Sequence, residues 1–430
     1  MAERGGFLEE LSTTEAEAGI ESAAPAFRLR TFSSLRYLNY RYLWTGTVLM
    51  SAGQWIQQVT LGWLLYDLTG SSVLLGALNG VRALPFLVAG PIAGVAADRM
   101  DRKKLMLNTQ YVLVFTALSM GVLVASGYLR AWHLFVFTLF TGMAWAFNEP
   151  VRQSLVPGMV PKHELMNAIT LNSAGFNLTK VIGPALGGVL IAAFGAAGNF
   201  FVQSAAYMGV LAMVYLMRVP PTSDEARKSS AMANLKEGFA YVWSNPTVLA
   251  LMAAAYVPRV FAVPYQALMP VFQKDVLGVG PGGLGLLMAA PGAGAVFSVL
   301  LLASTAHRIK RKGLLLLWSL VCLGSLLIVF SRITSFPLAL LALVGVGASQ
   351  IIFMATTNTL LQMTVPDALR GRVMSLYMLD RGLMPVGALM AGVTAHVVGA
   401  PLTVAAMGGI VILLALLVSW RVPVLRKIET

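Results

Sequence analysis

The segment Gly94-Val-Ala-Ala-Asp98-Arg99-Met-Asp101-Arg102-Lys103-Lys104 joins two long runs of apolar residues in the first half of the chain. Four of its eleven residues are basic and two are acidic. The flanking runs, about 72–97 and 104–126, are each long enough to cross the roughly 30 Å of bilayer hydrocarbon. The segment is therefore expected to be a short charged loop at a membrane surface.

The composition of the whole chain also points to a membrane. Of its 430 residues, 57% are hydrophobic and 11% are charged, and the mean hydropathy is +0.75. A soluble globular protein has about 25% charged residues. Residues 1–24 contain six glutamates and one arginine, without the apolar core of a signal peptide. We interpret this first stretch as an acidic tail.

Working outward from the charged segment, the sequence predicts an all-α polytopic membrane protein with twelve transmembrane helices. The longest loop within the chain separates span six from span seven, so the spans divide into two groups of six. The predicted spans are approximately 42–66, 72–97, 104–126, 131–154, 164–194, 199–217, 247–273, 280–305, 313–332, 336–359, 370–397 and 400–421.

Five regions follow from this division. They are a cytoplasmic N-terminal tail (1–38), an N-terminal six-helix bundle (39–217), a cytoplasmic linker (218–246), a C-terminal six-helix bundle (247–421) and a cytoplasmic C-terminal tail (422–430). Within the linker, the spacing of apolar residues over 232–243 predicts an amphipathic helix on the inner membrane surface, with a plain linker as the alternative.

Basic residues predict the orientation. Twenty-three of them, including Arg152, fall in or near the loops on one side, whereas the other side has only Arg130, Lys274 and Arg332. Cytoplasmic loops carry the excess of Lys and Arg. We therefore expect a multi-pass protein of the cell inner (plasma) membrane with both termini in the cytoplasm, and topology explains the net charge of +13 without nucleic acid.

The two halves of the chain resemble each other. A shift of 209 residues aligns Gly76 with Gly285, and a shift of 204 aligns Gly183 with Gly387. Such matches predict two six-helix repeats, an architecture that places the substrate site near the bilayer midplane between the halves.

The segment from Gly94 to Lys104 resembles the motif between spans two and three of the major facilitator superfamily, with Asp101 where the motif has glycine. Within that superfamily, the chain resembles enterobactin exporters and macrolide efflux proteins over residues 28–421. The stretches that carry this resemblance are Gly53-Gln54-Trp55-Ile56-Gln57, Leu84-Pro85, Gly183-Pro-Ala-Leu-Gly187-Gly188, Val365-Pro366 and Arg370-Gly-Arg-Val-Met-Ser375. The resemblance implies a secondary active transporter that exports an amphiphilic small molecule, such as a siderophore or a drug, by alternating access.

A charge cluster is predicted at the cytoplasmic ends of spans two and four. Asp98 and Arg102 are four residues apart, and helix rise places Glu149 near the same membrane face. We interpret them as a conformational latch, and the resemblance implies a similar charge relay. The other latch residues from the motif are Gly94, Arg99 and Lys103. The alternative is a set of unrelated surface charges, worth about 0–1 kcal/mol.

Ionisable residues inside membrane spans are costly and indicate function. The sequence places Arg82, Lys180, Arg259 and Arg381 within spans, and few acidic residues accompany them. We interpret the site as a substrate cavity that attracts an anionic or carboxylate-bearing molecule. Its predicted residues are Gln54, Gln57, Gln58, Arg82, Lys180 and Arg259. The alternative is that the cations serve helix carbonyls, as Lys180 would near the kink at Pro184.

Two further assignments concern coupling and packing. Asp380 and Glu149 are the only carboxylates predicted within spans, so they are the candidates for proton coupling in an antiporter. The residues Gly183, Pro184, Gly187 and Gly188 form a motif that permits close helix packing.

Other classes of function fit the sequence less well. The four histidines are scattered at span ends, and no spacing typical of a metal site, a nucleophile or a phosphate loop is present. We therefore predict no enzyme activity and no cofactor. The expected partners are a small-molecule substrate, protons and the lipid bilayer, and the chain is expected to be a monomer. A lysophospholipid or other metabolite transporter and a non-transporting membrane sensor stay open as alternatives.

Overall fold

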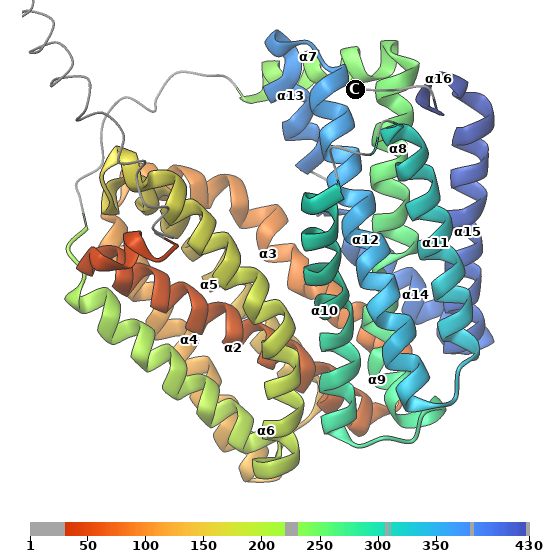
Figure 1. Ribbon diagram of the computed structural model, residues 1–430. Coiled ribbons are helices and arrows are strands. Elements are labelled where there is room, and N and C mark those ends of the chain that lie inside the picture. The colour runs from red at the N-terminus through yellow and green to blue at the C-terminus, as the bar shows by residue number, and fades with distance from the viewer. Residues whose placement is uncertain (1–30, 220–230, 306–308, 310, 379–381, 427–430) are drawn as a thin grey trace, which may run out of the picture.

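The computed structural model describes residues 31–219, 231–305, 309, 311–378 and 382–426, and within them every element is a helix (Figure 1). Helices satisfy their backbone hydrogen bonds internally, which long apolar segments in lipid require. The first half contains η1 (Ser33–Arg36), α2 (Leu38–Thr69), α3 (Ser72–Arg99), α4 (Arg102–Ala125), α5 (Ala131–Met159), η2 (Lys162–Glu164) and α6 (Leu165–Leu216).

The second half begins after the segment 220–230. It contains α7 (Ala231–Ser244), α8 (Pro246–Phe261), η4 (Val263–Leu268), α9 (Met269–Val271), η5 (Phe272–Val276), α10 (Pro281–Thr305), α11 (Lys312–Arg332), α12 (Phe336–Thr364), α13 (Asp367–Met378), α14 (Met384–Val398), α15 (Ala400–Arg421) and α16 (Pro423–Arg426). Of the predicted spans, number seven is divided among α8, η4, α9 and η5, and number eleven between α13 and α14.

Seven helical stretches in the described residues are long and apolar enough to cross a membrane. The longest of them includes α6, which reverses direction at Gly195 as Figure 1 shows. Gly195 has φ of 69°, a conformation that glycine adopts without a steric penalty. The Asn199 side chain donates a hydrogen bond of 3.3 Å to the carbonyl of Gly187, which joins the two arms of the turn.

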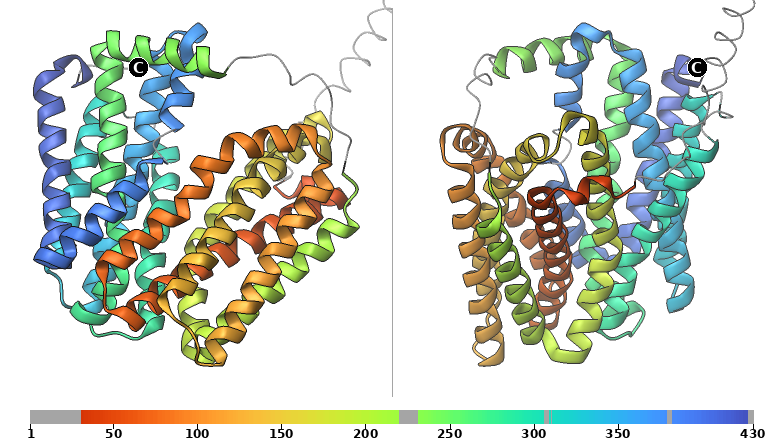
Figure 2. Two further views of the ribbon diagram at one scale, coloured as in Figure 1. Left: turned by 180° about the vertical axis from the view of Figure 1, so that it is seen from behind. Right: turned by 60° about the vertical axis from the view of Figure 1, so that its left-hand side comes forward.

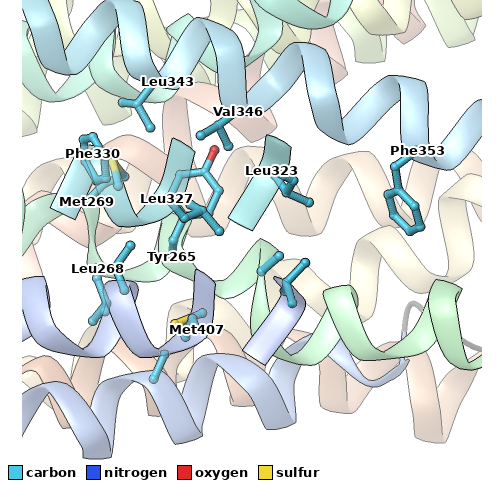
Figure 3. Packing of buried hydrophobic residues seen from close by; sticks show 14 of the residues in the cluster. Tyr265, Leu268, Met269, Leu323, Leu327, Phe330, Leu343, Val346, Phe353 and Met407 are labelled. Carbon is cyan, nitrogen blue, oxygen red and sulfur yellow. The ribbon is translucent and has the colours of Figure 1, made fainter. Parts of the chain in front are cut away.

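One cluster of buried apolar side chains lies within the first half, and a larger one extends across both halves. In the first half, Tyr40, Met50, Met106 and Tyr207 are buried together with neighbouring apolar side chains. In the second half, side chains of η4 and α9 pack against α11 and α12, as Figure 3 shows. The labelled residues there are Tyr265, Leu268, Met269, Leu323, Leu327, Phe330, Leu343, Val346, Phe353 and Met407.

The two groups of helices meet along two helix pairs, α6 with α10 and α3 with α14. Figures 1 and 2 show the groups converging at the end where α9 lies and diverging toward the end where α7 and α13 lie. The distribution of basic residues predicts that the divergent end is cytoplasmic. The contacts between the halves are therefore concentrated toward the end predicted to be extracytoplasmic.

The helix α7 coincides with the amphipathic segment predicted over 232–243. It contacts α13, and Glu237 forms an ion pair with Arg372. On α7 the rings of Phe239 and Trp243 are exposed and stack with centroids 6.1 Å apart. An exposed aromatic pair beside charged residues suits a helix at a membrane–water interface.

The beginning of the described chain is fastened to the junction between α5 and α6. Ser33 Oγ donates a 2.6 Å hydrogen bond to Glu164 Oε2, and Arg36 Nη2 lies 3.4 Å from Glu164 Oε1. This carboxylate thus anchors η1 at the predicted cytoplasmic end of the N-terminal bundle.

Candidate functional site

Glycines permit the close approach of the two halves. A Cβ atom on Gly188 of α6 would lie 2.8 Å from Gly285 Cα of α10. A Cβ atom on Gly76 of α3 would lie 2.6 Å from the Ala388 carbonyl oxygen of α14. Real Cβ atoms essentially never come closer than 3.0 Å to another heavy atom in this way. Any larger residue at Gly76 or Gly188 must therefore push backbone against backbone.

The predicted packing motif on α6 serves two different contacts. Gly183 and Gly187 bring α6 against α2 within the first half, where a Cβ on Gly183 would lie 2.7 Å from Trp55 Cβ. Gly188 and the carbonyl of Pro184 instead face Gly285 across the boundary between the halves. The same motif therefore allows α6 to pack closely against α2 within the first bundle and against α10 of the second bundle.

Polar residues at the convergent end connect α2 with η5. Lys274 Nζ lies 2.9 Å from Asp67 Oδ1, and the Tyr66 hydroxyl donates a hydrogen bond to Asp275. We call these four residues the end clamp. Of these four residues, only Lys274 was named from the sequence, as one of the three basic residues on the side opposite the cytoplasmic loops.

A small cavity lies between the halves and is named here the Arg82 cavity. Its walls come from α2, α3 and α5 on one side and from η4, α9 and α10 on the other. The lining residues are Gln58, Leu61, Gly62, Leu75, Leu78, Asn79, Arg82, Thr138, Gln266, Ala267, Pro270 and Met288. Two residues predicted for the substrate cavity, Gln58 and Arg82, are thereby brought together.

A second small cavity shares Gln266 and Met288 with the first and is named here the Lys180 cavity. Lys180 and Trp55 come from the first half. The remaining lining residues come from the second half and are Tyr265, Gln266, Met269, Leu287, Met288, Pro291, Gly292, Ala295, Gly347, Gln350 and Ile351. Arg259 of α8 is close enough to Lys180 for their positive charges to repel each other.

The remaining predicted cavity residues lie elsewhere. Gln57 is 4% exposed, donates to Thr141 Oγ1 at 3.1 Å and accepts a 3.0 Å hydrogen bond from Gln203. Its amide therefore has partners inside the first half, and we do not retain it as a cavity residue. Gln54 is half-buried and belongs to the lining of neither cavity.

Arg152 corrects the sequence-based assignment of the loops. It was counted with the cytoplasmic loop residues, but the structure places it within α5 at 7% exposure. Its guanidinium donates hydrogen bonds to the Leu43 carbonyl at 3.1 Å, to Thr47 Oγ1 at 2.9 Å and to Asn148 Oδ1 at 3.2 Å. The sequence missed this buried cation because it lies close to the predicted end of span four.

The charged segment between α3 and α4 forms a capped helix start. Asp101 Oδ1 accepts hydrogen bonds from the backbone amides of Lys103 and Lys104 at 2.8 and 3.1 Å. Lys103 Nζ donates to the carbonyls of Tyr215 and Met217, both at 2.8 Å, at the end of α6. Asp101 thus caps α4 at the position where the superfamily motif has glycine.

The other predicted latch and coupling residues are only partly described. Glu149 accepts a 3.1 Å hydrogen bond from Gln153, four residues along the same helix. The side chains of Asp98 and Arg99 and the surroundings of Gly94 lie outside the described part of the chain, as does the whole of Asp380.

The sequence model of the family described as transmembrane secretion effector matches residues 29–430. The chain belongs to this family of major facilitator transporters. Helices long and apolar enough for membrane spans are consistent with membership.

Curated relatives of this major facilitator transporter include three efflux or siderophore proteins. The staphyloferrin A transporter of Staphylococcus aureus (strain NCTC 8325 / PS 47) is 26% identical, with 86% of this chain and 92% of the relative covered. Macrolide efflux protein A of Streptococcus pyogenes is 22% identical over 84% and 90%. The enterobactin exporter EntS of Citrobacter koseri (strain ATCC BAA-895 / CDC 4225-83 / SGSC4696) is 28% identical over 73% and 71%. These matches confirm the resemblance seen in the sequence.

Solved structures share the fold of the transporter. A bacterial homolog of the human lysosomal transporter Spinster, described as inward-facing and unoccupied, matches with a TM-score of 0.70 and 16% identity. The match covers 90% of this chain and 98% of the other. At this identity the similarity establishes the fold only.

Proposed function

We propose that the chain is a secondary active exporter of an amphiphilic small molecule and works by alternating access in the cell inner membrane. The observation that carries this proposal is the pair of cavities that open between two halves whose mutual contacts are concentrated at one end. A rocking motion that separates that end and closes the other would expose these cavities to each side in turn. Efflux relatives support export over import.

The same proposal includes twelve transmembrane helices in two six-helix repeats, divided as the sequence predicts. Two glycine contacts support it. Gly188 meets Gly285, and Gly392 meets Gly76, with hypothetical Cβ distances to the facing Cα of 2.8 and 3.1 Å. The shift of 209 residues relates Gly76 to Gly285, and the shift of 204 relates Gly188 to Gly392. The pseudo-twofold rotation that superimposes one half on the other therefore turns each contact into the other. Two parallel repeats require such a relation.

Protons supply the driving force in this proposal. Asp380 and Glu149 take up and release them, since carboxylates within spans are the groups able to titrate there. Asp98, Arg102 and Glu149, together with Gly94, Arg99 and Lys103, form the latch that closes the cytoplasmic end when the opposite end opens. The two groups of helices diverge at the end predicted to be cytoplasmic, so in this proposal the latch closes in the other state.

Flux measurements test the function. We expect purified protein in liposomes to move a carboxylate-bearing siderophore only when a proton gradient is applied, and Asp380→Asn to abolish that dependence. Arg332→Gln, a charge change at an exposed span end, is the matched control. If the proton gradient is dissipated without movement of substrate, the protein does not exchange protons for substrate. If substrate moves equally fast without a proton gradient, transport is not coupled to protons.

The latch is tested by Asp98→Asn. We expect this variant to insert normally and to lose most of its transport, because it removes the acid that would close the cytoplasmic end. Asp101→Asn removes the same charge three residues away, and asparagine caps a helix as well as aspartate does. The latch proposal fails if both variants transport at equal rates.

A further inference from the structure

The two cavities between the halves present more hydrogen-bond donors than acceptors. The Lys180 cavity contains the indole of Trp55 and the hydroxyl of Tyr265. Trp55 Nε1 and Tyr265 Oη are buried without a hydrogen-bond partner in the described residues, and Tyr265 is 1% exposed. The neighbouring Gln266 side chain lies near the hydroxyl but forms no hydrogen bond of normal geometry with it. An indole N–H can only donate, so a ligand that satisfies it must offer an acceptor.

The charges in both cavities have the same sign. Each lining contains one cation, Arg82 or Lys180, and neither lining contains a carboxylate. In the part of the chain that the structure describes, these two side chains have neither a hydrogen bond nor an ion pair. A cation held away from bulk water is costly unless an opposite charge meets it, so an anionic ligand stabilises this arrangement.

The cations occupy separate cavities that adjoin. Gln266 and Met288 belong to both linings, so the two cavities are neighbours, and a ligand that reaches both cations must pass these two side chains. The intervening walls include Leu287, Met288 and Leu78, which suit an apolar scaffold. A single acidic group would neutralise one cation and leave the other exposed to the apolar wall.

We propose that the substrate is an amphiphile with two carboxylate groups. One carboxylate accepts hydrogen bonds from Lys180, Trp55 and Tyr265, and the other binds the Arg82 guanidinium. This inference rests on the proposed transport function, to which it adds the chemical class of the substrate.

Binding by purified full-length protein in lipid nanodiscs tests the site without requiring transport. The probes are adipate, sebacate and dodecanedioate, each with its monomethyl and dimethyl esters, measured by isothermal titration calorimetry. We expect at least one dicarboxylate to bind about tenfold more tightly than its monoester and the diester to bind more weakly still. Arg82→Gln and Lys180→Gln should each remove the preference for the dicarboxylate over the monoester.

Charge-conserving variants separate ligand binding from a structural role. Arg82→Lys and Lys180→Arg should keep part of the preference, whereas Arg332→Gln at an exposed span end should leave it unchanged. Equal binding of diacid and diester, or a preference that survives both glutamine variants, overturns the proposal. Diacid binding without flux in liposomes would support the site and refute the transport function. Flux of another compound without diacid binding would refute the site alone.

Discussion

A short chemical crosslink between positions 67 and 274 is expected to abolish transport reversibly. Asp67 and Lys274 form the ion pair of the end clamp, with Nζ and Oδ1 2.9 Å apart, and they belong to opposite halves. If the halves must separate at this end to release substrate, a covalent link between them holds the cavities closed on that side. The pair is half-exposed, so the charge attraction itself contributes little, and breaking it by mutation alone should have a modest effect.

The experiment uses Asp67→Cys with Lys274→Cys in a Cys322→Ala background, because Cys322 is the only native cysteine and is exposed. A bis-methanethiosulfonate reagent is applied, flux is measured, and a reducing agent is then added to restore it. A disulfide alone demands a narrow geometry, so a linker is preferable.

The matched control links two residues of the same half. Tyr111 and Tyr215 are exposed on α4 and α6, and their hydroxyl groups are in contact. Cysteines at these two positions, linked by the same reagent, should leave the rate of transport unchanged because both move with one bundle. Full activity of the protein linked between 67 and 274 would show that this end does not open during transport.

The arrangement of helices was predictable largely because apolar length and the sites of basic residues are local properties of the sequence. The sequence predictions were wrong where the structure is not determined by local apolar length and charge. Span seven is broken over 262–276, where Pro264 and Pro270 lie at the starts of η4 and α9, but its apolar composition alone predicts one continuous span. Arg152 was assigned to a loop for a similar reason. It lies near the end of a predicted span, and the sequence does not show that its guanidinium is buried among neutral hydrogen-bond acceptors.

The candidate site was predictable in part for a different reason. Arg82, Lys180 and Gln58 were found because polar groups inside apolar runs are conspicuous, and they do line the cavities. Gln57 satisfies the same criterion, yet its amide is satisfied by Thr141 and Gln203. Which side of a helix faces a partner depends on tertiary packing. For the same reason, the end clamp joins residues about 207 positions apart that no local pattern connects.

Gly76→Leu is expected to reduce transport severely, whereas Gly80→Leu should have a small effect. Both glycines lie on α3, so the two changes alter helix propensity equally. A Cβ at position 76 would lie 2.6 Å from the Ala388 carbonyl oxygen, while a Cβ at position 80 would meet nothing within 4 Å. Overpacking of this kind costs about 1–3 kcal/mol, or roughly five- to 150-fold in an equilibrium.

The cost arises only in the state in which α3 and α14 are in contact, so the substitution shifts the population toward the state in which this end is open. Flux through liposomes measures the loss. Labelling of a cysteine at position 67 by a membrane-impermeant thiol reagent measures the shift, and we expect faster labelling in Gly76→Leu than in Gly80→Leu. Slower transport without a change in labelling would indicate local damage rather than a displaced conformational equilibrium.

Gly285→Leu tests whether the two halves, which are related in sequence, also move in an equivalent way during transport. Gly285 aligns with Gly76, and a Cβ there would lie 2.6 Å from the Pro184 carbonyl oxygen of α6. The two substitutions therefore oppose the same conformation through different helix pairs. If the halves rock as rigid bodies about a common axis, both variants should increase labelling at position 67. Increased labelling in Gly76→Leu alone would mean that α3 separates from α14 while α6 and α10 stay in contact. Rigid-body rocking of two equivalent halves does not allow this result.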